Sequence, residues 1–366
     1  MSKPYSQFQA LWAITKASLK AIFKSPQSVF FSLFFPIVLI VVFGALSRGG
    51  GVSVDIAFDQ KTDTLNPVYY AIKNSPVFDI VKGTAADLED RMKKGRITAI
   101  LDVEKLPADS NNAKYDIHYR YSSANQRELP ALQLFLNSVV NQVTQQQNGT
   151  TKVVTVSGEE VPGRIYKMID FYLPGMIGFS LIGASVFGVA FLFFGLRETL
   201  VLKRMYASPV KKAYIVIGES LSRLIFQMTT VVVLILFGKY FYNFTLANGL
   251  LTFLELLVLS LVALMVFMGF GFIISSVAKN QNVIPIYANI FMFPQYFLSG
   301  TFFPKNALPQ SIQWLVDILP LTALNDGLRK VAFEGAHLND CWKQLLIMGV
   351  WGVIVYAAAV KVFRWE

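Results

Sequence analysis

The sequence predicts a polytopic α-helical membrane protein with an α/β domain inserted after its first membrane helix. More than half of the 366 residues are hydrophobic and only 15% are charged, whereas about a quarter of the residues are charged in soluble domains. Several apolar segments are long enough to cross a bilayer, which takes about 20 residues. The segment 48–168 lies between the first two of them and instead has short apolar runs, mixed charges and many turn residues.

The net charge of +10 is concentrated in two places. Residues 1–27 contain four lysines and no acid, and residues 196–212 contain five cations and one acid. Residues 48–168 nearly balance, with 15 cations and 14 anions. Short loops rich in Lys and Arg lie on the cytoplasmic side of a membrane. The positive charge therefore marks the cytoplasmic face, and we expect no nucleic-acid partner.

Residues 1–27 are predicted to form an amphipathic helix in the cytoplasmic membrane interface. Apolar side chains recur at helical spacing, and lysines occupy much of the remaining surface. Pro26 marks a bend before the first membrane span, residues 28–47. A cleavable signal peptide is the alternative, but the basic segment is long and amphipathic for that role.

Residues 48–168 are predicted to fold as an extracytoplasmic α/β domain, because the first span begins inside the cell. We expect strands at 52–58, 97–103 and 116–121 and helices at 85–94 and 128–147. Thr84 suits the N-cap of the first helix, and Gly95 suits its end. No nucleophile–base pair stands out, and one cysteine with two histidines far apart in sequence predicts no metal site.

Residues 169–366 are predicted to hold five further spans, which gives six membrane helices with both termini in the cytoplasm. They cover 172–196, 221–242, 250–277, 283–299 and 342–362. Residues 301–340 contain an apolar stretch that is too short to cross, so we expect an external re-entrant or interfacial helix pair. Cys341 precedes Trp342 at the outer end of the last span, where an impermeant maleimide should reach it.

The basic piece between the second and third spans, residues 196–210, is predicted to be a short helix that ends at Ser208-Pro209. Its motifs are Arg197-Glu198, then Lys203-Arg204, then Ala207-Ser208-Pro209-Val210. In order and spacing they resemble the coupling helix of bacterial ABC-2 type permeases. The charged-Gly-Thr triplet usual after Arg-Glu is replaced by Thr199-Leu200-Val201. A basic loop that only fixes topology is the alternative.

A second set of motifs follows the fifth span and is similar to the same family. It consists of Gly300-Thr301-Phe302-Phe303-Pro304, Leu308-Pro309, Pro320-Leu321 and Gly327-Leu328-Arg329. The order of elements in residues 48–168 resembles the external domain of the larger ABC-2 permeases. Together these resemblances cover nearly the whole chain.

The resemblance implies a permease subunit of an ABC exporter in the bacterial cytoplasmic (inner) membrane. Arg197, Glu198, Lys203, Arg204, Ser208 and Pro209 would then contact a separate ABC ATPase subunit, which binds ATP and Mg. The implied assembly is a homodimer, or a heterodimer with a second permease, and further partners are membrane lipids and a periplasmic adaptor. Multidrug efflux is one candidate use, but a drug, a lipid, a sodium ion or a peptide all remain open as cargo.

The chain is not expected to hydrolyse ATP itself or to bind a cofactor. A phosphate-binding loop requires G-x-x-x-x-G-K-[ST], whose backbone N–H groups hold the phosphates. The pair Gly238-Lys239 is followed by Tyr240, and Val233 occupies the position of the first glycine. The ATPase is therefore expected to be another polypeptide.

A few polar groups within the predicted spans are candidates for a role in transport. Glu219 and Arg223 have the i,i+4 spacing of a helical ion pair. Glu255 lies inside the fourth span, where an unpaired charge is costly and often functional. The candidates for the translocation path or gate are Glu255, Phe291, Phe293, Gln295 and Asp317.

Two other classes of membrane protein remain alternatives. A secondary transporter would show inverted repeats and broken polar helices near the midplane, and neither is apparent. A membrane receptor or sensor could use residues 48–168 to bind an external ligand. Such a receptor normally has fewer spans and a cytoplasmic output domain.

Overall fold

The computed structural model describes residues 6–46, 54–75, 77–93, 95–106, 115–123, 128–146, 154–161, 167–199, 210–305 and 308–362. The chain forms two compact units. We call Met1–Ser47 with Met168–Glu366 the helical unit, and Arg48–Lys167 the sheet unit. The sheet unit thus coincides closely with the segment whose composition differs from the rest.

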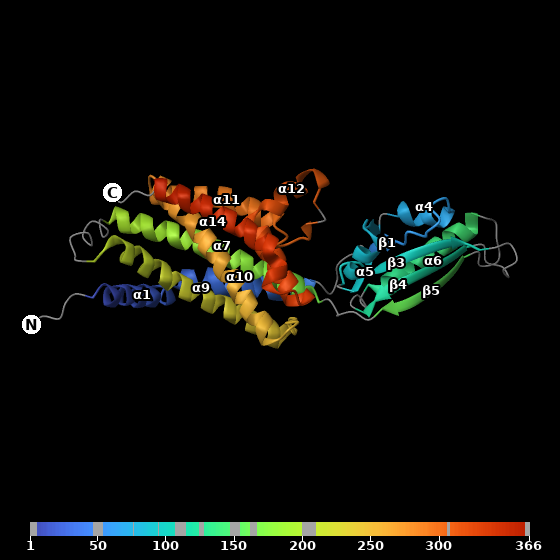
Figure 1. Ribbon diagram of the computed structural model, residues 1–366, viewed down its shortest axis with the longest axis horizontal. Helices are drawn as coiled ribbons and strands as arrows, with labels where there is room; N and C mark the ends of the chain where they lie inside the picture. Colours follow the sequence, from blue (N-terminus) through green and yellow to red (C-terminus); the bar gives the residue numbers. More distant parts are fainter. Residues whose placement is uncertain are drawn as a thin grey trace, which may run out of the picture. The chain divides into compact units, whose positions relative to one another are not determined.

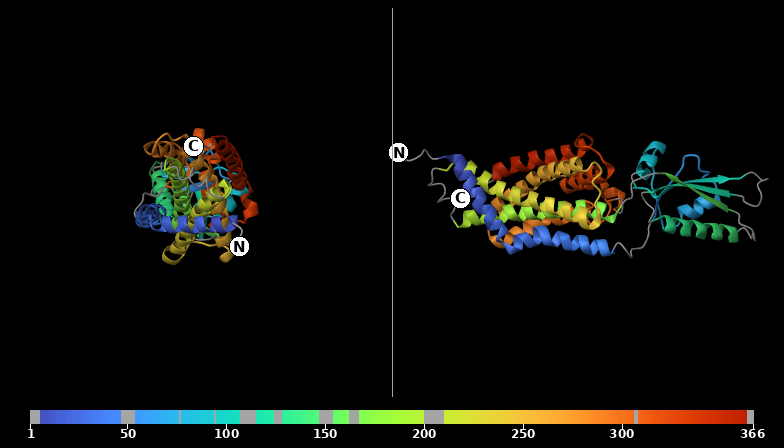
Figure 2. Two further views of the ribbon diagram at one scale, coloured as in Figure 1. Left: turned by 90° about the vertical axis from the view of Figure 1, so that its left-hand side faces the viewer. Right: turned by 90° about the horizontal axis from the view of Figure 1, so that it is seen from below.

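The helical unit begins with α1 (Gln7–Phe23), which the Ser6 hydroxyl caps by accepting a 3.4 Å hydrogen bond from the Gln9 amide. A second helical segment follows, made of α2 (Pro26–Val29), the π-helix η1 (Phe30–Phe34) and α3 (Phe35–Leu46). The two meet at an elbow between α1 and α2 (Figure 2). Pro26 suits this place, because proline is favoured at the first position of a helix, where its missing N–H would have no partner inside the helix.

Four helices in the described residues are long and apolar enough to span a membrane: Met168–Glu198, Ala213–Tyr242, Leu250–Val277 and Leu338–Val362. They correspond to α7 (Met168–Glu198), α9 (Lys212–Tyr242), α10 (Leu250–Val277) and η6 (Leu338–Cys341) with α14 (Trp342–Val362), which lie side by side in Figure 1. The chain is thus a multi-pass membrane protein, as predicted.

The other two predicted spans are shorter than the sequence indicates. The first consists of α2, η1 and α3, and its apolar part is the shorter stretch Phe30–Phe43, which contains η1. The fifth is α11 (Ile284–Leu298), with only 15 residues. It ends at Leu298, and Gly300 two residues later has a φ of +68°, a left-handed conformation that glycine adopts readily. Six crossings therefore remain a prediction, whereas four are supported by length and composition.

The predicted helix pair after the fifth span is present as α12 (Gln310–Ile318) and α13 (Pro320–Arg329), followed by the π-helix η5 (Lys330–Glu334). The Lys305 ammonium lies 2.9 Å from the Asp317 carboxylate and 2.6 Å from that of Asp326. Burial lowers the pKa of Lys305, but the two carboxylates outweigh it and raise that pKa. Lys305 therefore holds α12 and α13 together.

The core of the helical unit is built around α7, which packs on α3, α9, α10 and α11. A Cβ at Gly271 of α10 would lie 2.7 Å from the Val189 side chain of α7, so glycine permits this close approach. Cys341 belongs to this core and is fully buried. The prediction that it is accessible from outside is therefore wrong, because the residue packs inward although Trp342 beside it is exposed.

The sheet unit has one five-stranded sheet in the order β2-β1-β3-β4-β5. Its strands are β1 (Val54–Phe58), β2 (Phe78–Ile80), β3 (Ala99–Lys105), β4 (Tyr115–Ser122) and β5 (Val154–Val161). Only the β3–β4 pair is antiparallel. Helices α4 (Pro67–Lys73) and α6 (Leu129–Gln146) cover one face, and α5 (Ala85–Lys93) covers the other (Figure 1). The Thr84 hydroxyl caps α5, and Gly95 beyond it has a φ of +67°.

Candidate functional site

Helix α1 packs directly against the first turns of α9. The Thr15 hydroxyl donates to the carbonyl of Leu11 in its own helix at 2.9 Å, and it also lies 3.1 Å from the Gly218 carbonyl of α9. A Cβ at Gly218 would come within 3.1 Å of the Ile14 side chain and 3.2 Å of the Leu11 carbonyl. Glycine at this position therefore lets the two helices approach closely.

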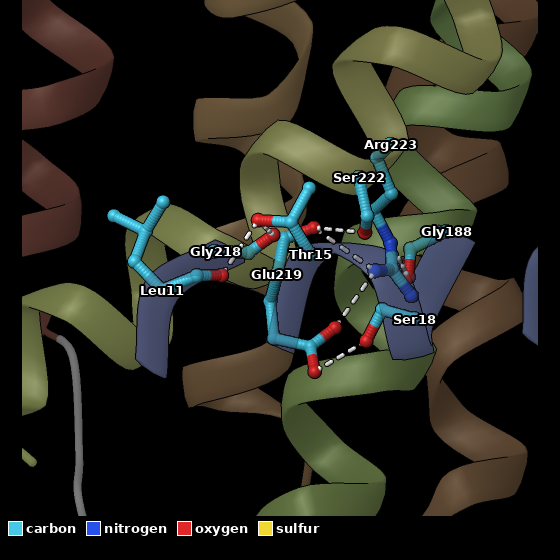
Figure 3. Close-up of polar contacts among 8 residues, drawn as sticks. All are labelled: Leu11, Thr15, Ser18, Gly188, Gly218, Glu219, Ser222 and Arg223. Carbon is cyan, nitrogen blue, oxygen red and sulfur yellow. Dashed lines mark hydrogen bonds and ion pairs between the residues drawn. The ribbon is translucent and has the colours of Figure 1, made fainter. Parts of the chain in front are cut away.

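A buried polar cluster joins α1, α9 and α7 one turn further on (Figure 3). The Ser18 hydroxyl of α1 donates a 2.6 Å hydrogen bond to the Glu219 carboxylate of α9. The same carboxylate pairs with the Arg223 guanidinium at 3.3 Å, and Arg223 donates to the Gly188 carbonyl of α7 at 3.1 Å. The predicted Glu219–Arg223 pair is thus present, and it connects three helices rather than stabilising one.

The start of α9 is also attached to α1. The backbone N–H of Lys211, which is the N-cap residue of α9, donates a 3.0 Å hydrogen bond to the Gln7 side-chain oxygen. An N–H at a helix start has no partner inside its helix, so Gln7 satisfies a donor that the fold otherwise leaves open. The first and third turns of α1 therefore both hold α9.

On the other side of the basic stretch, the last turn of α7 is attached to the end of α10. The Arg197 guanidinium donates to the Ala278 carbonyl at 2.9 Å and to the Ser276 carbonyl at 3.5 Å. It also lies over the Phe194 ring, 5.2 Å from its centroid. A cation stabilises the free carbonyls at a helix C-terminus. Arg197 therefore stabilises the C-terminal end of α10, while Glu198 next to it is exposed.

The remaining predicted coupling residues lie outside the described part of the chain. Lys203, Arg204, Ser208 and Pro209 fall within residues 200–209. The described flanks are joined to neighbouring helices. Arg197 binds the end of α10, the Lys211 N–H binds Gln7 of α1, and Glu219 of α9 binds Ser18 of α1.

The three predicted path residues of α11 face different neighbours. The Phe291 ring stacks on Phe270 of α10, with 3.8 Å between centroids. The Gln295 side chain is buried, and its oxygen accepts a 3.2 Å hydrogen bond from the Leu321 N–H at the start of α13. Phe293 is 52% exposed, on the surface of α11. Only Phe293 is free to contact lipid, cargo or another chain, whereas the other two hold helices together.

The two acidic candidates are both engaged within the protein. The Glu255 carboxylate of α10 is buried, lies 3.1 Å from His337 and accepts the Leu338 N–H at 3.4 Å. Its second oxygen has no hydrogen-bond partner among the described residues. Asp317 pairs with Lys305. Glu255 therefore ties α10 to the segment before α14, and the two acids lie in separate networks.

Comparison with known proteins identifies the family. Residues 26–361 match the ABC-2 family transporter protein family. The chain belongs to this family. It is 21% identical over 386 residues to the linearmycin resistance permease protein LnrN of Bacillus subtilis. The aligned region covers 96% of this chain and 98% of that protein.

A second relative of this ABC-2 chain is much longer. It is ABC transporter G family member 20 of Dictyostelium discoideum, 23% identical over 370 residues, which are 95% of this chain. The chain spans about half the length of that relative. The family resemblance predicted from the coupling motifs is thus confirmed, and it extends over most of the chain.

The residues that sequence analysis missed in this ABC-2 chain are partners that lie far away in sequence. Ser18 and Thr15 resemble ordinary polar residues of an amphipathic helix, yet both bind α9 about 200 positions later. Arg329 was noticed only as part of a motif, and it donates to the Phe171 carbonyl and lies 4.0 Å from the Phe171 ring. The one local signal for this helix contact in the sequence was a small residue, Gly218, directly before an acidic residue.

Proposed function

We propose that this chain is the membrane permease subunit of an ABC exporter, and that a separate ATPase subunit drives it. The observation that carries the proposal is the attachment of both flanks of the basic stretch, by Arg197 to α10 and by Gln7 and Ser18 to α1. A loop that only fixes topology needs its charge alone. It does not require two sets of specific contacts on the helices around it.

The contacts can transmit a displacement of the stretch to the membrane helices. The stretch directly continues α7 and precedes α9, and Arg223 joins these two helices through the Gly188 carbonyl. Packed helices and buried hydrogen-bonded networks carry coupling when they have two discrete arrangements. In the proposal, ATP binding and hydrolysis on the partner move the stretch, and α7, α9 and α1 move together.

The ATPase is a partner because the sequence lacks the glycine and Ser/Thr positions of a phosphate-binding loop around Gly238-Lys239. We place the assembly in the bacterial inner membrane as two permease chains with two ATPase chains. Both termini would face the cytoplasm, and the sheet unit would lie outside. The relative named for linearmycin resistance is consistent with an exported small molecule as cargo.

The test is to express the chain together with candidate ABC ATPase subunits from the same genome and to measure the mass of the purified complex in mild detergent. We expect two copies of each chain, and faster ATP hydrolysis by the ATPase when it is bound. Arg204→Glu should weaken the association, whereas Lys61→Glu in the sheet unit should leave it unchanged as a matched charge control. ATP hydrolysis by this chain alone, or equal association of both variants, would refute the proposal.

A further inference from the structure

The elbow between α1 and α2 contains an open groove that the proposed coupling function does not use. Its volume is about 530 Å³, within the range of sites that bind one small molecule. Six residues line it: Phe23, Lys24, Pro26, Val29, Phe30 and Phe34. The lining is thus mostly apolar, with three phenylalanines and one lysine.

The π-helix η1 places aromatic side chains on the protein surface at this groove. Phe30 and Phe34, both in η1, are 48% and 54% exposed, and Phe23 at the end of α1 is 52% exposed. A π turn shifts the side chains that follow it around the helix axis, and such turns are frequent at functional sites. Three half-exposed phenylalanines require an apolar neighbour outside the chain, which a bilayer supplies.

The wall of the groove carries positive charge without a nearby acid on the same segment. Lys16, Lys20 and Lys24 are exposed and spaced four residues apart, so they share one side of α1. Residues 6–46 contain no Asp or Glu. The lysine row therefore ends at the groove, where Lys24 is part of the lining.

We propose that this groove is a binding site for one anionic phospholipid. An acyl chain lies against Phe23, Phe30 and Phe34, and the lipid phosphate binds the Lys24 ammonium, with Lys20 one turn away. The acyl chain of such a lipid matches the apolar part of the lining, and its anionic head group matches Lys24. A lipid without net negative charge matches the apolar part alone.

The site is joined to the transport helices through the backbone of η1. The carbonyl of Ser32 accepts a 2.6 Å hydrogen bond from the Ser180 hydroxyl of α7, and the Gln227 amide of α9 donates to Ser180 at 2.9 Å. All three residues are buried. A lipid that holds η1 in its present form therefore also supports the contact of the first membrane segment with α7 and α9.

The experiment uses the purified full-length protein and native mass spectrometry with added phosphatidylglycerol or phosphatidylcholine of equal chain length. We expect phosphatidylglycerol to be retained in preference to phosphatidylcholine. Lys24→Gln should reduce this retention roughly fivefold, the effect of one cation near anionic lipid, and Lys24→Arg should restore it. Phe30→Ser should reduce the retention of both lipids.

The matched control is Lys16→Gln, two turns earlier on the same row and outside the groove lining. It should retain phosphatidylglycerol as the unaltered protein does. Equal losses for Lys16→Gln and Lys24→Gln would mean a diffuse charged surface and overturn the site. Equal retention of the two lipids by the unaltered protein would overturn it as well. Lys24 is exposed, so its replacement leaves the fold intact, and a thermal unfolding curve checks this for Phe30→Ser.

Discussion

The Ser18 hydroxyl lies 2.6 Å from the Glu219 carboxylate, although 201 positions separate the two residues in the chain. This hydrogen bond and the Glu219–Arg223 ion pair hold α1 against α9 in the described structure. Both ionic side chains are largely buried, with exposed fractions of 9% for Glu219 and 16% for Arg223. The pair is therefore sensitive to the loss of either member.

Replacing Glu219 by Ala should destabilise the helical unit strongly. The Arg223 guanidinium would remain buried without its partner, which costs about 3–5 kcal/mol. Ser18→Ala removes one hydrogen bond to a charged group and should cost less, about 1.5–3 kcal/mol. Thermal unfolding in detergent measures both. A Glu219→Ala protein as stable as the unaltered one would contradict the role of the pair.

Replacing Arg197 by Gln should separate the last turn of α7 from the end of α10. The lost charge-assisted bond to the Ala278 carbonyl is worth about 1.5–3 kcal/mol, which is enough to shift a two-state equilibrium by roughly tenfold or more. We expect the partner ATPase to bind normally but to respond less to the permease. Lys239→Gln, which removes the same charge at an exposed position near the other end of α9, is the control and should respond normally. A reduced response in both variants would assign the effect to the loss of charge rather than to the bond with α10.

The stability of the sheet unit should fall as pH rises from about 4 to above 6. Burial, together with the nearby Asp79 and Glu128 carboxylates, raises the pKa of Asp55 from 3.8 to about 6. The unfolded chain therefore loses this proton at a lower pH than the folded chain does. Folding is penalised once pH exceeds the unfolded value, and the penalty is complete above the folded one.

Hydrogen exchange of the β1 and β2 amides in the full-length protein, corrected for intrinsic exchange rates, measures this dependence. Asp55→Asn should reduce the fall and make these strands more protected at pH 7. Asp90→Asn, at an exposed position of α5, should preserve it. Loss of protection in Asp55→Asn at pH 7 would show that the ionised carboxylate is stabilising.

Cys341 should not react with maleimide in the folded protein, because its side chain is fully buried. Labelling of the unaltered protein after unfolding in detergent confirms that the thiol itself is reactive. The topology is then tested with Asn339→Cys in a Cys341→Ser background, because Asn339 is exposed two residues earlier. An impermeant maleimide should label this variant in right-side-out spheroplasts. Labelling only in inverted vesicles would reverse the proposed orientation.

Features that depend on neighbouring residues were predictable from the sequence. Helix α5 lies close to where Thr84 and Gly95 indicated, and β1, β3 and β4 match their predicted strands within a few residues. Strand β5 was missed because it is an edge strand with mostly exposed residues, so it lacks the alternation that indicates a half-buried strand. Strand β2 has only three residues and offers too short a pattern.

The contacts of the candidate site were predictable only in part. The spacing of Glu219 and Arg223 is local, so their pair could be read directly. Their connection to Ser18 and Gly188 depends on how helices pack, which no spacing in the chain encodes. The division of Phe291, Phe293 and Gln295 among three environments has the same origin, since these residues lie on one helix and differ only in what surrounds it.

The distance along the chain between Ser18 and Glu219 also sets an order of events during synthesis. A ribosome adds about 5–20 residues per second, so roughly 10–40 seconds separate the appearance of α1 from that of its partner on α9. During that interval the exposed lysines and aromatic side chains of α1 can hold it at the lipid surface. Helix α1 is therefore made well before α9, and it can reach its final contacts only after that interval.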